Sequence, residues 1–110
     1  MEHLKFNTIN DLPWPIKSGI ENLFKKTKDD KNDWRMLAYR LGLKAAFIDE
    51  MEDNPPTNPC RKVFEEKNNV KVNKLIQELY QMERWDVLDS IQAEMSKWMG
   101  ILIHWNTILP

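Results

Sequence analysis

Apolar residues recur along this chain at spacings of three and four, and no stretch alternates apolar and polar residues over the length of a strand. Such spacing places apolar side chains on one face of a helix. The first stripe predicts a helix that starts near Asp11, which can cap it, with Pro13 and Pro15 in its first turn, where a missing N–H costs little. The stripe consists of Ile16, Ile20, Leu23 and Phe24.

A cap and a glycine mark the limits of the second predicted helix. It begins at Asn32 or Asp33, both good N-terminal caps, and it ends before Gly42, because glycine readily adopts the left-handed conformation found at helix C-termini. Trp34 opens this helix on its apolar face, so we expect its ring to lie in the core. A third helix follows over about residues 44–52.

The second half of the chain predicts three more helices. The Pro-rich segment 54–59 must be a loop, because residues before proline avoid helical angles. Helices are then expected over about residues 59–67, with Asn58 as cap, over about residues 72–83, and from Trp85 or Asp86 onward. The sequence therefore predicts an all-α fold, a six-helix antiparallel bundle with an extended C-terminal helix.

Length and composition fit one globular domain. The chain has 110 residues, of which 42% are hydrophobic and 30% charged. We expect residues 11–92 to form the bundle, residues 1–10 a flexible N-terminal segment, and residues 93–110 a helical extension. The single cysteine, Cys60, permits no disulfide within the chain, and its place on an apolar helix face indicates a small buried hydrophobe.

Charge and hydropathy exclude several classes of protein. The net charge is −1, whereas a nucleic-acid binder usually has a basic surplus for its phosphate contacts. The N-terminus lacks the apolar core of a signal peptide. The most apolar run, residues 98–109, is shorter than the roughly 20 residues that a membrane helix needs. These observations predict a cytoplasmic protein that does not insert into membranes.

Several motifs in this frame are similar to those of the death domain family of six-helix interaction modules. The resemblance covers roughly residues 12–91, and it is most evident with the death domains of Toll/interleukin-1 receptor adaptors and Pelle-type kinases, of the neurotrophin receptor and of netrin receptors. The residues that carry it are Asp33-Trp34-Arg35-x-Leu37-Ala38, Leu41-Gly42-Leu43, Ile48-Asp49, Val72-x-x-Leu75-Ile76-x-x-Leu79-x-x-Met82 and Arg84-x-Asp86-Val87-Leu88.

The resemblance implies a protein–protein interaction module, either an adaptor or the death domain of a receptor or kinase. Its implied partners are other death domains, in homotypic complexes with itself or with relatives, which makes a homo-oligomer possible. The implied setting is signal transduction in apoptosis, innate immunity or axon guidance. Lys71 departs from the pattern, because many relatives place threonine or serine before the valine that opens helix five. The helix cap then moves to Asn69 or is lost, which costs about 1 kcal/mol.

Charged residues supply the predicted interface. An acidic cluster lies on and after helix three, and it is interpreted either as a solvated face or as a patch that meets a basic patch on a neighbour, where complementarity adds specificity. Arg35 and Arg61 are the favoured basic residues, because arginine binds carboxylates through two parallel bonds. Reversing the charge of Arg35 or Asp49 is expected to weaken assembly without unfolding the domain. The acidic cluster is Asp49, Glu50, Glu52 and Asp53, and the basic candidates are Lys25, Lys26, Lys28, Arg35, Arg40, Arg61 and Lys62.

The C-terminal segment is unusually apolar. If helix six continues, Trp98, Leu102 and Trp105 share one side of it. Three interpretations remain open: the segment folds back over the bundle, it forms an exposed interface, or it packs on a following domain. Arg84 and Asp86 likewise form either a local pair or part of an interface.

No motif indicates catalysis, and no cofactor or metal is expected. The two histidines and one cysteine lack the spacing of a metal site, and no phosphate-binding glycine loop is present. The alternative function is a small helical nucleic-acid-binding domain that reads DNA with helix two or four, which the net charge and the acidic cluster oppose.

Overall fold

The computed structural model describes residues 8–99, apart from the side chains of Met95, Trp98 and Met99. Within this range the chain is all-α, as predicted, and contains no strand beyond an isolated bridge between Thr8 and Lys71. A short 3₁₀ helix, η1, is followed by six α-helices. They are η1 (Ile9–Asp11), α1 (Trp14–Lys25), α2 (Trp34–Arg40), α3 (Ala45–Asp53), α4 (Pro59–Glu66), α5 (Val72–Gln81) and α6 (Trp85–Met99).

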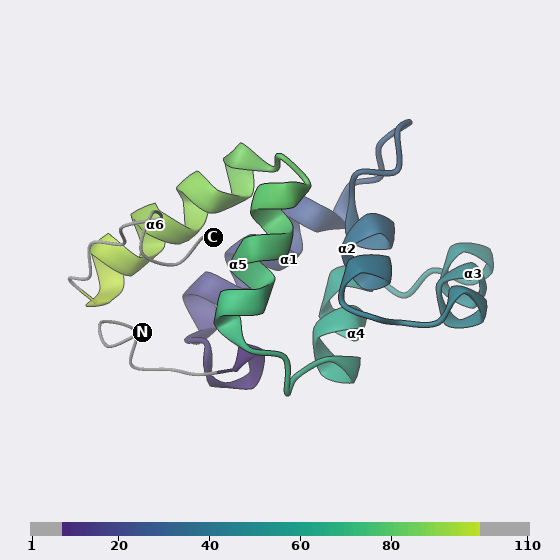
Figure 1. Cartoon of the computed structure of the whole chain (residues 1–110), viewed down its shortest axis with the longest axis horizontal. Coiled ribbons are helices and arrows are strands. Elements are labelled where there is room, and N and C mark those ends of the chain that lie inside the picture. Colours follow the sequence, from purple (N-terminus) through teal and green to yellow (C-terminus); the bar gives the residue numbers. More distant parts are fainter. Residues whose placement is uncertain (1–7, 100–110) are drawn as a thin grey trace.

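The helices pack as a bundle with α3 at one end. α1 packs against both α4 and α6, α5 packs against α6, and α2 packs against α3, α4 and α5. In Figure 1, α3 lies at the right-hand end, beyond α2 and α4. α6 has 15 residues, is the longest of the described helices and continues to Met99. The rest of the extension predicted over residues 93–110 lies outside the described residues. No helix between residues 8 and 99 is long and apolar enough to cross a membrane.

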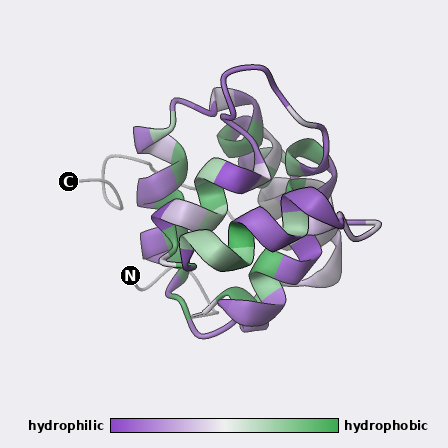
Figure 2. Ribbon diagram, turned by 90° about the vertical axis from the view of Figure 1, so that its right-hand side faces the viewer, coloured by the Kyte–Doolittle hydropathy of each residue, from purple (hydrophilic) through white to green (hydrophobic). Residues whose placement is uncertain are grey.

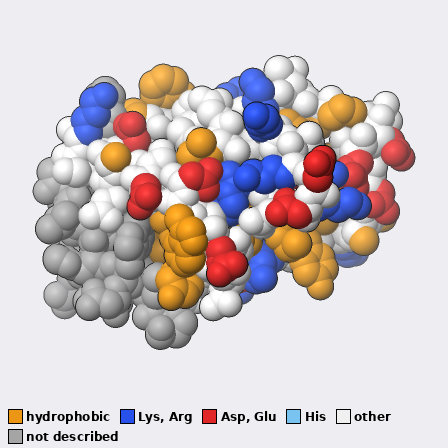
Figure 3. All heavy atoms as spheres, turned by 90° about the horizontal axis from the view of Figure 1, so that it is seen from above, with side chains coloured by type: hydrophobic (Ala, Val, Ile, Leu, Met, Phe, Trp, Pro, Cys, Tyr) orange, Lys and Arg blue, Asp and Glu red, His pale blue; other side chains and the backbone are white. Residues whose placement is uncertain are grey.

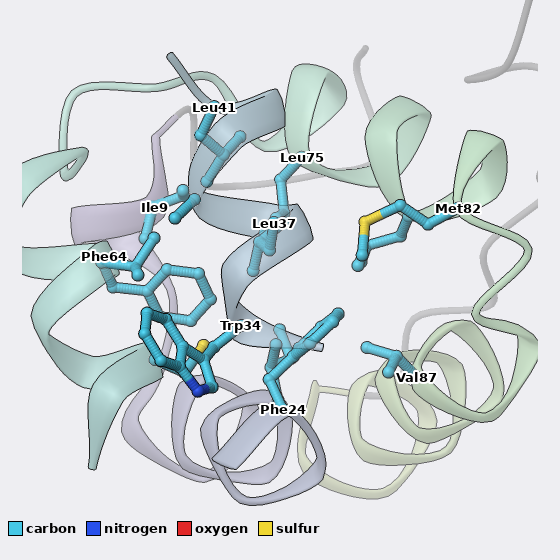
Figure 4. Close-up of a cluster of buried hydrophobic side chains, with 14 of the residues drawn as sticks. Ile9, Phe24, Trp34, Leu37, Leu41, Phe64, Leu75, Met82 and Val87 are labelled. Atoms are coloured by element: carbon cyan, nitrogen blue, oxygen red, sulfur yellow. The ribbon is translucent and has the colours of Figure 1, made fainter. Parts of the chain in front are cut away.

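The core is built from the apolar faces that the sequence pattern predicted. In Figure 2 hydrophobic residues alternate with hydrophilic ones along the helices, and Figure 4 shows Phe24, Trp34, Leu37 and Phe64 converging from α1, α2 and α4. Trp34 is only 2% exposed, and Cys60 is fully buried, so both predictions are confirmed. Burying one large apolar side chain contributes roughly 1.5–3 kcal/mol, and the core contains more than a dozen of them.

Helix ends follow their local chemistry. The Asp33 carboxylate caps α2 by accepting the Arg35 N–H, and the Asn58 side chain caps α4 by accepting the Arg61 N–H. Gly42 has the predicted left-handed conformation, with φ of 97°. The N–H groups of Gly42 and Leu43 close α2 by bonding to the carbonyls of Tyr39 and Ala38. At α5, Lys71 takes the cap position without a side-chain hydrogen bond, so the cap is lost rather than moved to Asn69.

The start of the chain differs from the prediction in two ways. α1 begins at Trp14, and the Asp11 carboxylate accepts hydrogen bonds from the N–H and hydroxyl of Thr8 instead of capping α1. Ile9 is fully buried, and its N–H donates to the carbonyl of Val70. Residues 8–10 therefore belong to the bundle, which starts earlier than residue 11. Residues 1–7 lie outside the described part of the chain.

Candidate interaction surfaces

The acidic cluster forms the exposed face of α3. Asp49, Glu50, Glu52 and Asp53 are all exposed. Glu52 forms an ion pair with Arg35 at 3.2 Å, whereas Asp49, Glu50 and Asp53 form no ion pair within the described structure. Figure 3, viewed from above, shows acidic side chains gathered at the end that α3 forms. Three unpaired carboxylates on one short helix therefore make a concentrated negative surface.

Arg35, a favoured interface candidate, is held inside the chain. Its Nη2 and Nε donate to both carboxylate oxygens of Asp33, at 2.6 and 2.9 Å. Nη2 also donates to the Lys28 carbonyl at 2.8 Å, and Nη1 donates to Glu52 at 3.2 Å. Only 16% of its side chain is exposed. Arg35 thus joins α2, the α1–α2 loop and α3, and few of its donors are left for a neighbouring molecule.

The Asp33 carboxylate at the centre of this network is completely buried. Burial alone would raise its pKa, but the hydrogen bonds from the Arg35 side chain and from the N–H groups of Arg35 and Lys28 outweigh that effect and lower the pKa. Asp33 therefore remains ionised at neutral pH and fixes the α1–α2 loop against the start of α2.

Arg40 also forms an internal pair. Its Nη1 donates to Glu78 on α5 at 3.1 Å, and Lys74 contacts the other oxygen of the same carboxylate at 3.3 Å. One third of the Arg40 side chain is exposed. This three-residue network ties α2 to α5, so Arg40 contributes to the bundle's internal contacts as well as to its surface.

Lysine and arginine side chains from two helices line one concavity. Lys25, at the end of α1, lies with Arg61 and Lys62 of α4 around a surface hollow of about 390 Å³, whose other wall includes Pro56 and Thr57. Arg61 is 60% exposed, although its Nε contacts the buried carboxylate of Glu21 at 3.3 Å. Lys62 pairs loosely with Glu66, and Lys26 is exposed next to Lys25. We call Lys25, Arg61 and Lys62 the basic groove.

Arg84 and Asp86 form a local pair, which settles their role inside the bundle. The Arg84 guanidinium donates to both oxygens of Asp86 at 2.9 Å, and it also donates to the carbonyls of Asn32 and Leu23. It lies 4.6 Å from the centre of the Phe24 ring, a favourable cation–π arrangement. The guanidinium lowers the pKa of Asp86 through these hydrogen bonds. Arg84 thereby joins the end of α1 to the α5–α6 corner.

Sequence reasoning missed the exposed aromatic residues. Trp14 is 76% exposed, Tyr39 69%, Trp85 48% and Tyr80 42%. Tyr80 and Trp85 pack edge to face, with ring centres 5.2 Å apart. The signal was present, because all four fall outside the apolar stripes of their helices.

The other sequence candidates have simple positions. Burial raises the pKa of the Cys60 thiol well above its ordinary value, so it stays protonated. Residues 8–99 contain no group of three His, Cys, Asp or Glu side chains that could hold a metal ion. In the proposed tail interface, Trp98 lies in α6 with its side chain undescribed, and Leu102 and Trp105 lie outside the described residues.

Comparison with known proteins supports the resemblance noted in the sequence. The family model described as "Death domain" matches residues 18–95, which is most of the chain. Comparisons with curated proteins and with solved structures give no significant match. Death domains are non-enzymatic modules that bind other death domains in homotypic complexes. The family match and the six-helix bundle together show that this chain belongs to the death domain family.

Proposed function

We propose that the chain is the death domain of a cytoplasmic signalling adaptor, receptor or kinase, and that it assembles by docking the acidic face of α3 onto the basic groove of the next domain. The supporting observation is the separation of exposed charges of opposite sign on two surfaces. Three carboxylates without ion pairs lie on α3, and Lys25, Arg61 and Lys62 surround one hollow between α1 and α4. Opposite charges on different surfaces favour head-to-tail contacts, which can propagate into larger assemblies.

Exposure and internal pairing favour the basic groove over Arg35 for this role. Arg35 donates hydrogen bonds to Asp33, to Glu52 and to the Lys28 carbonyl, whereas 60% of the Arg61 side chain is exposed to solvent. We therefore assign the docking role to the basic groove rather than to Arg35. An incoming carboxylate would meet three cations there, with Glu65 as the one anion in the lining, whereas an isolated surface ion pair is worth at most about 1 kcal/mol.

Charge reversal on each side tests the proposal. Asp49→Lys with Glu50→Lys should abolish capture of death-domain partners and self-assembly, and so should Arg61→Glu with Lys62→Glu. A mixture of the two double variants should regain binding, because one acidic and one basic surface again face each other. Binding is measured by sedimentation and by capture followed by mass spectrometry.

A matched control adds charge elsewhere. Asn73→Lys places a cation on the exposed side of α5 and should leave binding unchanged. Retained binding in both double variants, with circular dichroism showing intact helices, would remove α3 and the basic groove from the interface.

A further inference from the structure

The α5–α6 corner combines exposed aromatic rings with carboxylates. Tyr80 and Trp85 stack edge to face there, and each keeps more than 40% of its surface in solvent. Glu83, Asp86 and Asp89 are exposed around them. Figure 3 looks onto this side of the molecule and shows hydrophobic side chains with acidic ones beside them. We call these five residues the aromatic corner. Aromatic faces and carboxylates both attract a cationic side chain.

The α1–α2 connection offers the opposite charge. Lys25, Lys26, Lys28 and Lys31 lie between residues 25 and 31, and all four are exposed without an ion pair in the described part of the chain. Only two carboxylates, Asp29 and Asp30, share this segment. We call residues 25–31 the lysine loop. Four cations against two anions give it a local positive surplus in a chain of nearly neutral total charge.

Part-buried hydrogen bonds connect Asn32, which directly follows the lysine loop, to the α5–α6 corner. The Arg84 guanidinium donates to the Asn32 carbonyl at 2.6 Å while it binds Asp86, and the Asn32 side chain donates to the Met82 carbonyl at 2.9 Å. Lys28 lies near enough to Asp86 to lower the pKa of that carboxyl. The lysine loop and the aromatic corner, which have opposite charges, are thus fixed side by side on one face of the molecule. Little ordering entropy is therefore lost when a partner binds both surfaces.

Neighbouring complementary surfaces on one rigid face are self-complementary under a two-fold axis. We propose that two copies of the chain form a symmetric dimer in which the lysine loop of each copy seats against the aromatic corner of the other. Each contact is made twice, which doubles its contribution. Tryptophan and tyrosine at the centre of such a contact supply the desolvated anchors typical of interface hot spots. The dimer leaves α3 and most of the basic groove available, so it is separate from the head-to-tail docking proposed above.

Paired charge reversals test this arrangement on the full chain. The loop variant carries Lys26→Glu and Lys28→Glu, and the corner variant carries Glu83→Lys and Asp89→Lys. In the Asp49→Lys, Glu50→Lys background, which removes head-to-tail docking, sedimentation at low ionic strength should find the parent protein dimeric and each added variant monomeric, because acidic meets acidic in one and basic meets basic in the other. An equimolar mixture should form a heterodimer, since both of its contacts are then between opposite charges. A mixture that remains monomeric would overturn the proposal.

An aromatic pair of variants provides the second arm. Trp85→Ser should weaken the dimer about tenfold or more, whereas Trp14→Ser, which removes a more exposed ring beside α4, should leave it unchanged. If Trp85→Ser and Trp14→Ser changed the dissociation constant of the dimer equally, the aromatic corner would not be part of the dimer interface. Asp49→Lys with Glu50→Lys should not alter the dimer, so loss of head-to-tail docking and loss of the dimer are distinguishable. An open-ended assembly in that Asp49→Lys, Glu50→Lys background, where head-to-tail docking is removed, would contradict the two-fold axis.

Discussion

Asp33 and Arg84 each carry a charge that the fold keeps out of water, and each does so by filling the hydrogen-bonding capacity of its charged group. Asp33 is fully buried and Arg84 is 3% exposed. Four donors reach Asp33 from Arg35 and Lys28, and Arg84 bonds to Asp86 and to two backbone carbonyls. A buried charge is tolerated when all of its hydrogen bonds are made. Removal of one partner leaves the other charge buried without compensation, which strongly destabilises the fold. These residues therefore hold the α1–α2 loop in place.

Arg35→Ala is expected to destabilise the domain, in contrast to the expectation from sequence that Arg35 is a replaceable surface charge. At neutral pH the variant leaves the buried Asp33 carboxylate without its cation, and the free energy of unfolding should fall by about 3 kcal/mol. The pKa of Asp33 is lowered in the folded state. Its stabilising contribution is therefore complete above the unfolded pKa of about 4 and is lost as pH falls through the lower folded pKa.

Chemical denaturation of both proteins at several pH values checks this prediction. The stability difference between unmodified protein and Arg35→Ala should be full at neutral pH and should shrink as the pH falls below about 4 toward the lowered folded-state pKa of Asp33. Lys62→Ala is the control, because its exposed pair with Glu66 at 3.7 Å should contribute at most about 1 kcal/mol. A difference that does not change with pH would remove Asp33 from the explanation.

Elements with local signals were predictable, and elements fixed by distant contacts were not. The stripe of α5, the Asn58 cap and the glycine at the end of α2 depend on neighbours within one turn, and the structure has them as predicted. Prolines made the start of α1 ambiguous. Nothing near Ile9 in sequence shows that its N–H meets the Val70 carbonyl about sixty positions later. Glu83 is a further surprise, since a non-glycine residue with φ of 57° closes α5.

Two glycine substitutions should shift stability in opposite directions. Gly42→Ala is expected to lower the free energy of unfolding by about 1–2 kcal/mol, because φ of 97° strains any residue that has a Cβ. The strain comes from the backbone angle and not from crowding, since the nearest atom to the new Cβ is the Lys67 Nζ at 3.5 Å. Gly19→Ala in the middle of α1 is expected to raise it by about 1 kcal/mol. There the new methyl would lie 3.7 Å from the Ser90 hydroxyl, an ordinary contact. Thermal and urea unfolding measure both, and an unaffected Gly42→Ala would contradict the C-cap assignment.

At the scale of the whole molecule, the charged residues divide into those that hold the bundle and those left for partners. The sequence put Arg35 and Arg61 first and Arg40 among the other interface candidates, because ion pairs between distant helices leave no periodic signal. The structure pairs Arg35 with Asp33 and Arg40 with Glu78, and it brings Lys25 and Lys62, which lie far apart in the sequence, to one hollow. The sequence determines how many charged residues the chain has, whereas the fold determines which of them are left without an ion pair.

Ionic strength separates the two kinds of surface that the sequence put forward for assembly. Contacts between exposed charges weaken as the Debye length falls from about 10 Å at 0.1 M salt to about 3 Å at 1 M. If α3, the basic groove and the lysine loop carry association, the dissociation constant of the full chain should rise at least about tenfold across that range. An interface formed by Trp98, Leu102 and Trp105 would keep or gain strength instead, because hydrophobic burial is not screened by salt. Sedimentation of one sample in both buffers decides between them. Association that strengthens in high salt would move the interface from the charged faces to the apolar C-terminal segment.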